Sequence, residues 1–138
     1  MKSLTDGKLR QAMELRVATY TMMRVAFGFL FAFHGAQKLF GAFGGNQATD
    51  WKYWVAGSIE FFGGLGVAIG LFTQVAALGC CILMLVAYFY AHAPQGVLPI
   101  QNKGELALVY LFGFLYIAAR GGSKWSVDGR NRDADELD

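Results

Sequence analysis

Charged residues are scarce in this 138-residue chain and unevenly placed. They make up 16% of the sequence, against about a quarter of a typical soluble domain, while apolar residues make up 55%. The charges gather in residues 1–16, in residues 120–138 and in two short loops, and long apolar runs lie between them. This distribution excludes an ordinary soluble domain and predicts a membrane protein with a single domain.

Cysteine and proline are also rare. The two cysteines, Cys80 and Cys81, are adjacent within an apolar run and lack the spacing of a redox or metal motif, so they are predicted to be small packing residues. Both prolines, Pro94 and Pro99, fall in residues 93–104, which therefore cannot be helical throughout. The sequence also lacks a stripe of interleaved basic and aromatic residues, and this lack argues against a nucleic-acid partner.

The apolar runs are long enough to cross a bilayer. Four spans are predicted: Met22 to Phe40, Trp54 to Phe72, Val75 to Ala91 and Leu106 to Ala119. At 1.5 Å per residue the first two cover roughly 28 Å, close to the thickness of the hydrocarbon core. The fourth covers only about 21 Å, so its helix is expected to begin at Asn102 and to continue past Arg120. Only Thr73 and Gln74 separate the second and third spans, which predicts a tight helical hairpin.

The predicted fold class is therefore all-α, a polytopic four-helix membrane bundle. Residues 19–120 form the transmembrane domain. Residues 1–18 form an amphipathic segment whose residues 4–16 could lie on the membrane surface as a helix, and residues 121–138 form a tail whose Asp-rich end, 133–138, is expected to be disordered.

The orientation follows from lysine and arginine, because both ends of a four-span chain lie on one side of the membrane. That side carries Lys2, Lys8, Arg10, Arg16, Arg120, Lys124, Arg130 and Arg132. The opposite side carries only Lys52 and Lys103. The positive-inside rule therefore predicts that both termini are cytoplasmic.

Ionisable side chains inside the predicted spans are candidates for a functional site, because each costs roughly 2.5 to 3.5 kcal/mol at membrane depth. His34 and Lys38 lie four residues apart on one helix face, and Glu60 shares the depth of His34, about 4.5 Å to the outer side of the midplane. The face of Glu60 also carries small residues that let helices approach closely: Ala56, Gly57, Gly63 and Gly64. Glu60 is therefore predicted to face protein and to hydrogen bond with His34 or Lys38.

Four more polar residues are candidates for ligand binding, and most candidates have a plainer interpretation. Arg24 lies near the cytoplasmic end of the first span, while His92, Asn102 and Glu105 lie on the outer side. Asn102 and Glu105 have the spacing of a helix N-cap and its N3 carboxylate, and His92 could cap a helix C-terminus. Lys38 could extend to the membrane surface, and a pair of Glu60 with His34 could serve helix packing alone.

Several of these residues lie in segments that resemble successive motifs of the DoxX family. The segments are Arg24, His34-Gly35-Ala36-Gln37-Lys38-Leu39, Gly57-Ser58-Ile59-Glu60 with Gly63-Gly64, Asn102 with Glu105, and Gly121-Gly122-Ser123-Lys124-Trp125-Ser126-Val127-Asp128. Gly122 stands where the Gly-Pro-Gly form of the last motif has proline. The resemblance implies a four-helix bundle in the bacterial inner membrane with cytoplasmic ends. It also implies a redox link, since the family is named from a subunit of a quinone-reducing thiosulfate oxidoreductase.

Two functions are predicted. In the first, the chain is a redox-linked subunit that binds a quinone-like molecule in the outer half of the bundle, where His34 or Lys38 donates to a carbonyl oxygen and Glu60 exchanges the proton. In the second, the chain is a non-catalytic membrane subunit that stabilises or assembles a larger complex. The first function requires a partner subunit or a diffusing electron donor, because the sequence contains no evident electron carrier. The second requires other membrane protein subunits as partners.

Three other classes of site are less favoured. Haem is disfavoured because the two histidines, His34 and His92, differ by about 9 Å in estimated depth. A metal site formed by these histidines with Glu60 has suitable ligand types but no recognisable spacing. Transport of a small solute is a further alternative, since buried charges also mark transport pathways.

Overall fold

The structure, a computed structural model, describes residues 2–130, and these residues form helices joined by short loops. The main elements are α1 (Lys2–Phe40), the continuous run of α2 (Trp51–Ser58), η2 (Ile59–Gly63) and α3 (Gly64–Ile69), the run of α4 (Thr73–Ala87) and η3 (Tyr88–His92), and α6 (Glu105–Arg120). Three short helices lie in the loops: η1 (Ala42–Gly44), η4 (Ala93–Gln95) and α5 (Pro99–Asn102). The predicted all-α class with four main helices is confirmed.

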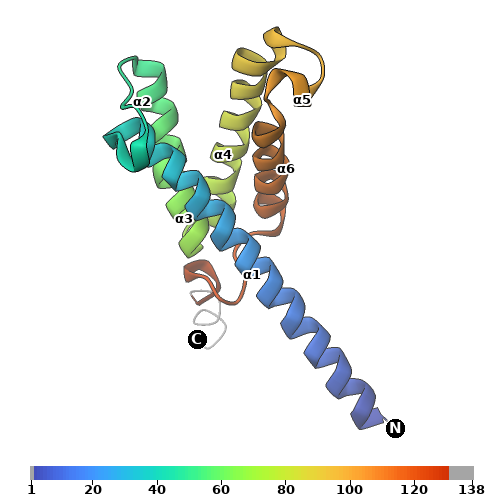
Figure 1. Ribbon diagram of the computed structural model, residues 1–138. Helices are drawn as coiled ribbons and strands as arrows, with labels where there is room; N and C mark the ends of the chain where they lie inside the picture. The colour runs from blue at the N-terminus through green and yellow to red at the C-terminus, as the bar shows by residue number, and fades with distance from the viewer. Residues whose placement is uncertain (1, 131–138) are drawn as a thin grey trace.

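The four main helices pack as two pairs (Figure 1). One pair is α1 with α2, η2 and α3, and the other is α4 with α6. Contacts of α4 with α3 and η2 join the two pairs. In Figure 1 the pairs come together near the end of α3 and diverge toward the end that holds α2 and α5. The core between them includes Phe31, Val67 and Phe114, each at most 1% exposed.

The surface of the helices is apolar, which fits a lipid environment. The segments Asp6–Phe40 and Thr73–Gln95 are long and apolar enough to cross a membrane by length and composition. Only 17% of the apolar window in Thr73–Gln95 is buried inside the molecule, and Ile82 and Val86 of α4 are more than half exposed. A core helix of a soluble protein would bury such residues, whereas a helix in lipid can leave them on its surface.

α1 is much longer than the span predicted within it. Its 39 residues correspond to about 58 Å of helix. Residues 4–16 are helical, as expected, but they continue α1 without a break and do not form a separate surface helix. The sequence offers no proline there to interrupt the helix. This N-terminal arm, residues 2–18, projects beyond the rest of the molecule (Figure 1), and Leu9 and Met13 on it are 60% and 64% exposed.

Two predicted boundaries are wrong and one predicted connection is confirmed. α6 begins at Glu105 and not at Asn102, because Lys103 adopts a positive φ of 59° that ends α5, and α6 ends at Arg120 without continuing past it. The tight hairpin is present, but its turn is residues 70–72 and not Thr73 and Gln74, because α3 ends at Ile69 and α4 already begins at Thr73. Its turn uses Gly70, whose φ of 75° is open to glycine without strain. The Asp-rich residues 133–138 lie outside the described residues.

Candidate functional site

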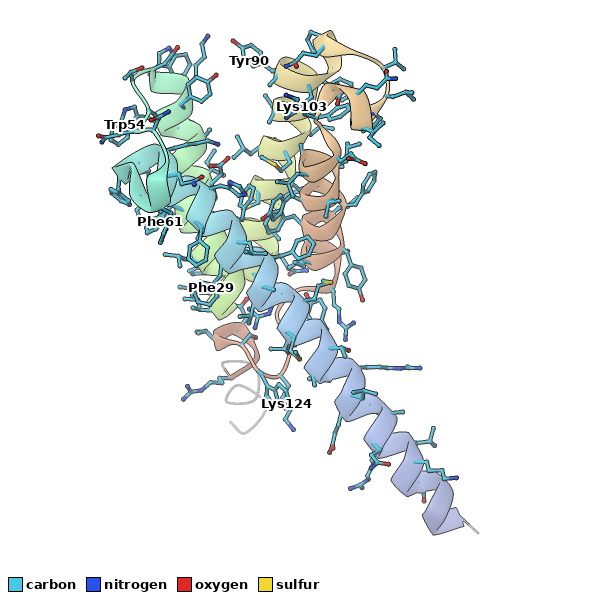
Figure 2. The ribbon with its side chains drawn as sticks, viewed as in Figure 1. Phe29, Trp54, Phe61, Tyr90, Lys103 and Lys124 are labelled. Atoms are coloured by element: carbon cyan, nitrogen blue, oxygen red, sulfur yellow. The ribbon has the colours of Figure 1, made fainter. Side chains whose placement is uncertain are left out.

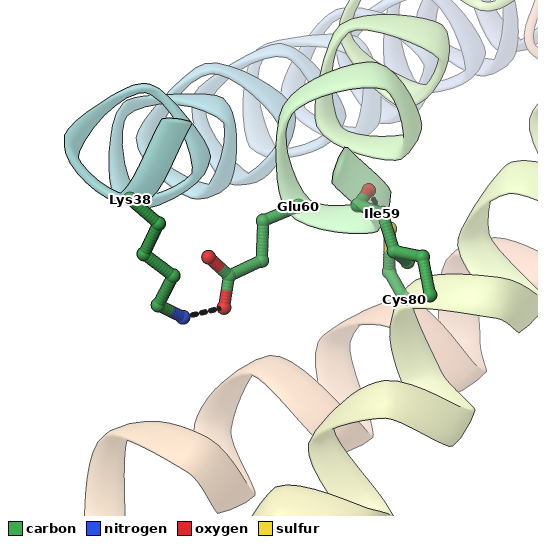
Figure 3. A network of polar contacts seen from close by, with 4 residues as sticks. All are labelled: Lys38, Ile59, Glu60 and Cys80. Atoms are coloured by element: carbon green, nitrogen blue, oxygen red, sulfur yellow. Dashed lines mark hydrogen bonds and ion pairs between the residues drawn. The ribbon is translucent and has the colours of Figure 1, made fainter. Parts of the chain in front are cut away.

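Glu60 and Lys38 form a buried ion pair between α1 and η2, as the sequence predicts. Lys38 Nζ donates to Glu60 Oε1 (Figure 3). Glu60 is 3% exposed, whereas the side chain of Lys38 is 32% exposed. The second carboxylate oxygen, Glu60 Oε2, is buried and has no hydrogen-bond partner among residues 2–130. The carboxylate therefore has one satisfied oxygen and one that a ligand or a proton could engage.

Local backbone structure brings Glu60 against α1. Glu60 lies in η2, a π-helical turn, and such turns are rare and occur often at functional sites. Glycines on both sides of the interface let the two backbones approach: a Cβ on Gly28 would lie 2.5 Å from the carbonyl oxygen of Gly64. Of the small residues predicted to share the face of Glu60, Gly57 and Gly64 face α1, whereas Gly63 faces the Sγ of Cys80 on α4. The close approach places Lys38 within reach of Glu60.

His34 and Tyr110 lie beside this ion pair. His34 is half-buried one helical turn before Lys38, and its ring meets the ring of Tyr110 edge to face at a centroid distance of 6.0 Å. No hydrogen bond joins His34 to Glu60 in the described part of the chain, but both His34 and Tyr110 lie close enough to interact electrostatically with its carboxylate. We call His34, Lys38, Glu60 and Tyr110 the Glu60 cluster.

Sequence reasoning missed Tyr110. It is 6% exposed and comes from α6, so it adds a third helix to the cluster. In an apolar run, an aromatic residue is easily taken for a lipid-facing side chain. The only signal that could have identified Tyr110 is its hydroxyl group, in the outer half of the predicted fourth span. Its ring also contacts Phe27, Phe31 and Phe114, which fixes its orientation.

The predicted outer-side residues His92, Asn102 and Glu105 do not hydrogen bond with the Glu60 cluster. Asn102 is fully buried and organises its own loop: its Nδ2 donates to the carbonyl of Gly96 at 2.8 Å, and its Oδ1 accepts from the amide of Gly104 at 2.8 Å. His92 Nδ1 lies 3.1 Å from the carbonyl oxygen of Asn102. The predicted capping pair is wrong, because the N-cap of α6 is Gly104 and Glu105 is exposed.

Arg24 lies at the opposite end of the molecule and has structural partners. Its side chain is 1% exposed, and it donates to three backbone carbonyls: Val67, Ala68 at 2.8 Å and Trp125 at 2.9 Å. Ten residues separate Arg24 from His34, or about 15 Å along α1. Arg24 thus joins α1 to the end of α3 and to the C-terminal segment. Its predicted role in ligand binding stays a prediction.

The segment after α6 folds back onto the bundle, with Gly122 in place of the expected proline. The hydroxyl of Tyr20 donates to the carbonyl of Gly121 at 2.6 Å. The carboxylate of Asp128 accepts from the amides of Phe72 and Thr73, at 2.9 and 2.8 Å, and from the hydroxyl of Thr73 at 2.6 Å. Asp128 therefore caps the N-terminus of α4 from a distant part of the chain.

Cys80 and Cys81 are free and buried, as predicted for packing residues. Figure 3 shows Cys80 beside Ile59, where its Sγ lies 3.9 Å from the carbonyl oxygen. Among the residues that the structure describes, no group of three or more His, Cys, Asp or Glu side chains could hold a metal ion.

A comparison with known families supports the resemblance over residues 19–93, which hold the motifs from Arg24 to Gly64. The DoxX family model matches residues 19–93, more than half of the chain. The chain belongs to the DoxX family. The matched region of this DoxX protein includes Arg24, His34, Lys38 and Glu60, and with the candidate membrane helices it identifies a membrane protein.

An uncharacterized protein of Haemophilus influenzae is similar to this DoxX protein. The two are 38% identical over 116 aligned positions, which cover 78% of this chain and 87% of the relative. No solved structure matches the chain.

Proposed function

We propose that this DoxX protein is a redox-linked subunit of the bacterial inner membrane that binds a quinone-like molecule at the Glu60 cluster. The observation that supports the proposal is the half-satisfied carboxylate of Glu60. Leaving a buried acceptor without a partner costs about 1–3 kcal/mol, and more for a charged group. A pair that served packing alone would gain stability from a second partner for Oε2, so the unpaired oxygen favours a site for a ligand or a proton.

The residues of the cluster suit proton transfer to such a molecule. A quinone takes up two electrons and two protons, so its site must deliver protons. A proton taken up by Glu60 on Oε2 can pass to the bound molecule, and the imidazole of His34 can relay the next proton to Glu60. Lys38 balances the charge of Glu60 after it loses its proton. The electrons would come from a partner subunit.

The proposal also includes the membrane topology. Four helices cross the membrane, both termini are cytoplasmic, and the Glu60 cluster lies in the outer half of the bilayer. The excess of lysine and arginine on the side of the termini supports this orientation. The burial of Glu60 supports a position where its carboxylate faces protein and not lipid.

The test compares Glu60→Gln and His34→Gln with Glu14→Gln, which neutralises an exposed carboxylate on the N-terminal arm. Glutamine keeps most of the volume and polarity of each residue, but its amide does not take up or release a proton near neutral pH. We expect all three variants to accumulate in the membrane. In the first two we expect a loss of quinone, measured by mass spectrometry after extraction of protein purified in mild detergent, and at least a tenfold loss of the redox activity of the native complex.

Two results would contradict the proposal. If Glu60→Gln and His34→Gln accumulate and keep both quinone and activity, the Glu60 cluster is not the site. If their accumulation collapses and activity falls only in proportion, the cluster holds helices together, and the chain is the non-catalytic assembly subunit.

A further inference from the structure

An open groove of about 890 Å³ lies at the end of the molecule opposite the Glu60 cluster. One wall is the N-terminal arm, from Lys8 to Ala18, and the other is the C-terminal segment at Lys124 and Trp125. Figure 2 shows Lys124 on the side of the C-terminal segment that faces this arm. Ala18 and His34 are sixteen residues apart, so about 24 Å of helix separate the groove from the Glu60 cluster.

The wall that carries Lys124 and Trp125 is fixed by hydrogen bonds. The carbonyl of Trp125 accepts from Arg24 Nη2 at 2.9 Å. The hydroxyls of Ser123 and Thr21 lie 2.8 Å apart, and Ser126 Oγ donates to the carbonyl of Ser123. The residues on both sides of Lys124 are thus anchored to the bundle, and the ammonium group extends from a preorganised backbone.

The lining of the groove is apolar with an excess of positive charge. Ala12, Val17 and Ala18 contribute apolar surface, and Trp125 adds an aromatic ring that is 57% exposed. Lys8 and Lys124 carry positive charges, against the single carboxylate of Glu14. Other exposed cations lie at this end of the molecule: Arg10, Arg16, Arg120 and Arg130. Asp128 is engaged at the N-terminus of α4 and is not among the residues that line the groove.

The groove lies where membrane helices would emerge into the headgroup layer. α4 begins at Thr73 and α6 ends at Arg120, only four residues before Lys124. Asp128 holds the C-terminal segment against the start of α4, so this segment stays at the level of the helix ends. An exposed tryptophan at such a level is typical of a membrane interface.

We propose that this groove binds the headgroup of an anionic phospholipid of the surrounding leaflet. The charges of Lys8 and Lys124 attract the phosphate, and Trp125 with the apolar wall of α1 covers the glycerol and the first methylene groups. A free phosphate ion would leave that apolar wall uncovered, so the lining favours a lipid. The inference depends on the proposed membrane position but not on the chemistry of the Glu60 cluster.

The experiment measures lipid binding to the purified full-length chain in neutral detergent by native mass spectrometry. The probes are phosphatidylglycerol, phosphatidylcholine and glycerol phosphate. The double variant Lys8→Gln/Lys124→Gln is compared with Arg10→Gln, which removes a positive charge from the same arm but outside the groove. All of these side chains are exposed, and unchanged helix content by circular dichroism confirms that each variant folds.

We expect the wild-type chain to prefer phosphatidylglycerol. Each lysine near an anionic headgroup contributes about fivefold in affinity, so the double variant should bind phosphatidylglycerol about 25-fold more weakly, and Arg10→Gln less than threefold. Unchanged binding by the double variant, or an equal loss in Arg10→Gln, would overturn the inference. Competition by glycerol phosphate at equal concentration would also overturn the inference, because it would identify a free anion as the ligand. A protein subunit found in the groove of the native complex would overturn it as well.

Discussion

At Glu60, fold stability and the proposed chemistry make opposite demands. A carboxylate that is 3% exposed needs partners for both oxygens to be stable, yet only Oε1 receives a hydrogen bond within residues 2–130. Lys38 compensates part of this cost, but its side chain remains partly exposed. The ion pair therefore contributes stability mainly by preventing an unpaired buried charge.

The contribution of this ion pair can be measured with Lys38→Met. The change keeps the length of the side chain and removes the charge, so Glu60 loses its counter-ion. We expect the free energy of unfolding to fall by about 2–3 kcal/mol, less than for a fully buried pair because Lys38 is partly exposed. Thermal or denaturant unfolding in detergent measures the loss. The double variant Lys38→Met/Glu60→Gln should recover most of it, and the exposed-site control Lys8→Met should be close to wild type.

Equal stability of Lys38→Met and Lys8→Met would show that the ion pair contributes nothing to the fold.

At the scale of the helices, the contact between α1 and the α2–α3 run depends on glycine. A Cβ on Gly28 would meet the backbones of Gly64 and Ala68, and a Cβ on Gly35 would meet the backbones of Gly57 and Phe61. Because the obstructing atoms belong to the backbone, no side-chain rotation can relieve the overlap. The two helices would have to move apart, and Lys38 would lose its reach to Glu60.

Gly35→Ala tests this interface, with Gly79→Ala on α4 as its matched control. Gly79 has open space around its Cβ position, so alanine there should be neutral or should stabilise the helix by up to about 1 kcal/mol. Gly35→Ala should lower the free energy of unfolding by about 1–3 kcal/mol. Unfolding of both variants in one detergent gives the comparison. Similar stability of Gly35→Ala and Gly79→Ala would mean that the backbones of α1 and of the α2–α3 run are farther apart than in the structure.

Asp128 makes a second element-scale contact, because it caps α4 from the other end of the sequence. Asp128→Ala removes three hydrogen bonds, to two amides and one hydroxyl, at the start of α4. We expect a loss of about 1–2 kcal/mol in the free energy of unfolding and faster hydrogen exchange at Phe72 and Thr73. Asp6→Ala, on the exposed arm, is the control and should change neither. Unchanged exchange at Phe72 in Asp128→Ala would contradict the cap.

At the scale of the whole molecule, the two ends of the bundle are joined differently. Arg24 and Asp128 tie the C-terminal segment to three helices at one end. At the other end, where the pairs diverge in Figure 1, Lys52 of α2 donates to the hydroxyl of Tyr90 in η3 at 3.2 Å. This hydrogen bond raises the pKa of Lys52.

The proposed topology predicts which residues a membrane-impermeant thiol reagent can reach. On a background without Cys80 and Cys81, single cysteines at Asp50 and Gln95 should react in intact cells. A cysteine at Lys124 should react only after the membrane is opened. All three positions are exposed, so burial cannot explain a lack of reaction. Reaction at Lys124 in intact cells, without reaction at Asp50 and Gln95, would show that the bundle has the opposite orientation.

Sequence patterns alone predicted the class of the protein and the burial of Glu60 beside a polar partner. Hydropathy is a sum over neighbouring residues, so it predicted a membrane protein, four helices and a hairpin between the second and third helices, although it placed the turn at Thr73 and Gln74. The burial of Glu60 and its pairing with His34 or Lys38 were also predicted, because helical rise places His34 and Glu60 at similar depth and a face of small residues directs Glu60 toward protein.

Only the tertiary structure decided the partners of Arg24, Asn102, Tyr110 and Asp128. The bonds of Tyr20 and Arg24 to the C-terminal segment each join residues 101 positions apart, and the bonds of Asp128 to the start of α4 cross more than 50. Periodicity and spacing describe what a segment prefers alone, whereas these contacts depend on which helix ends the fold brings together. The roles of Arg24 and Asp128 in closing one end of the bundle were therefore absent from every local pattern.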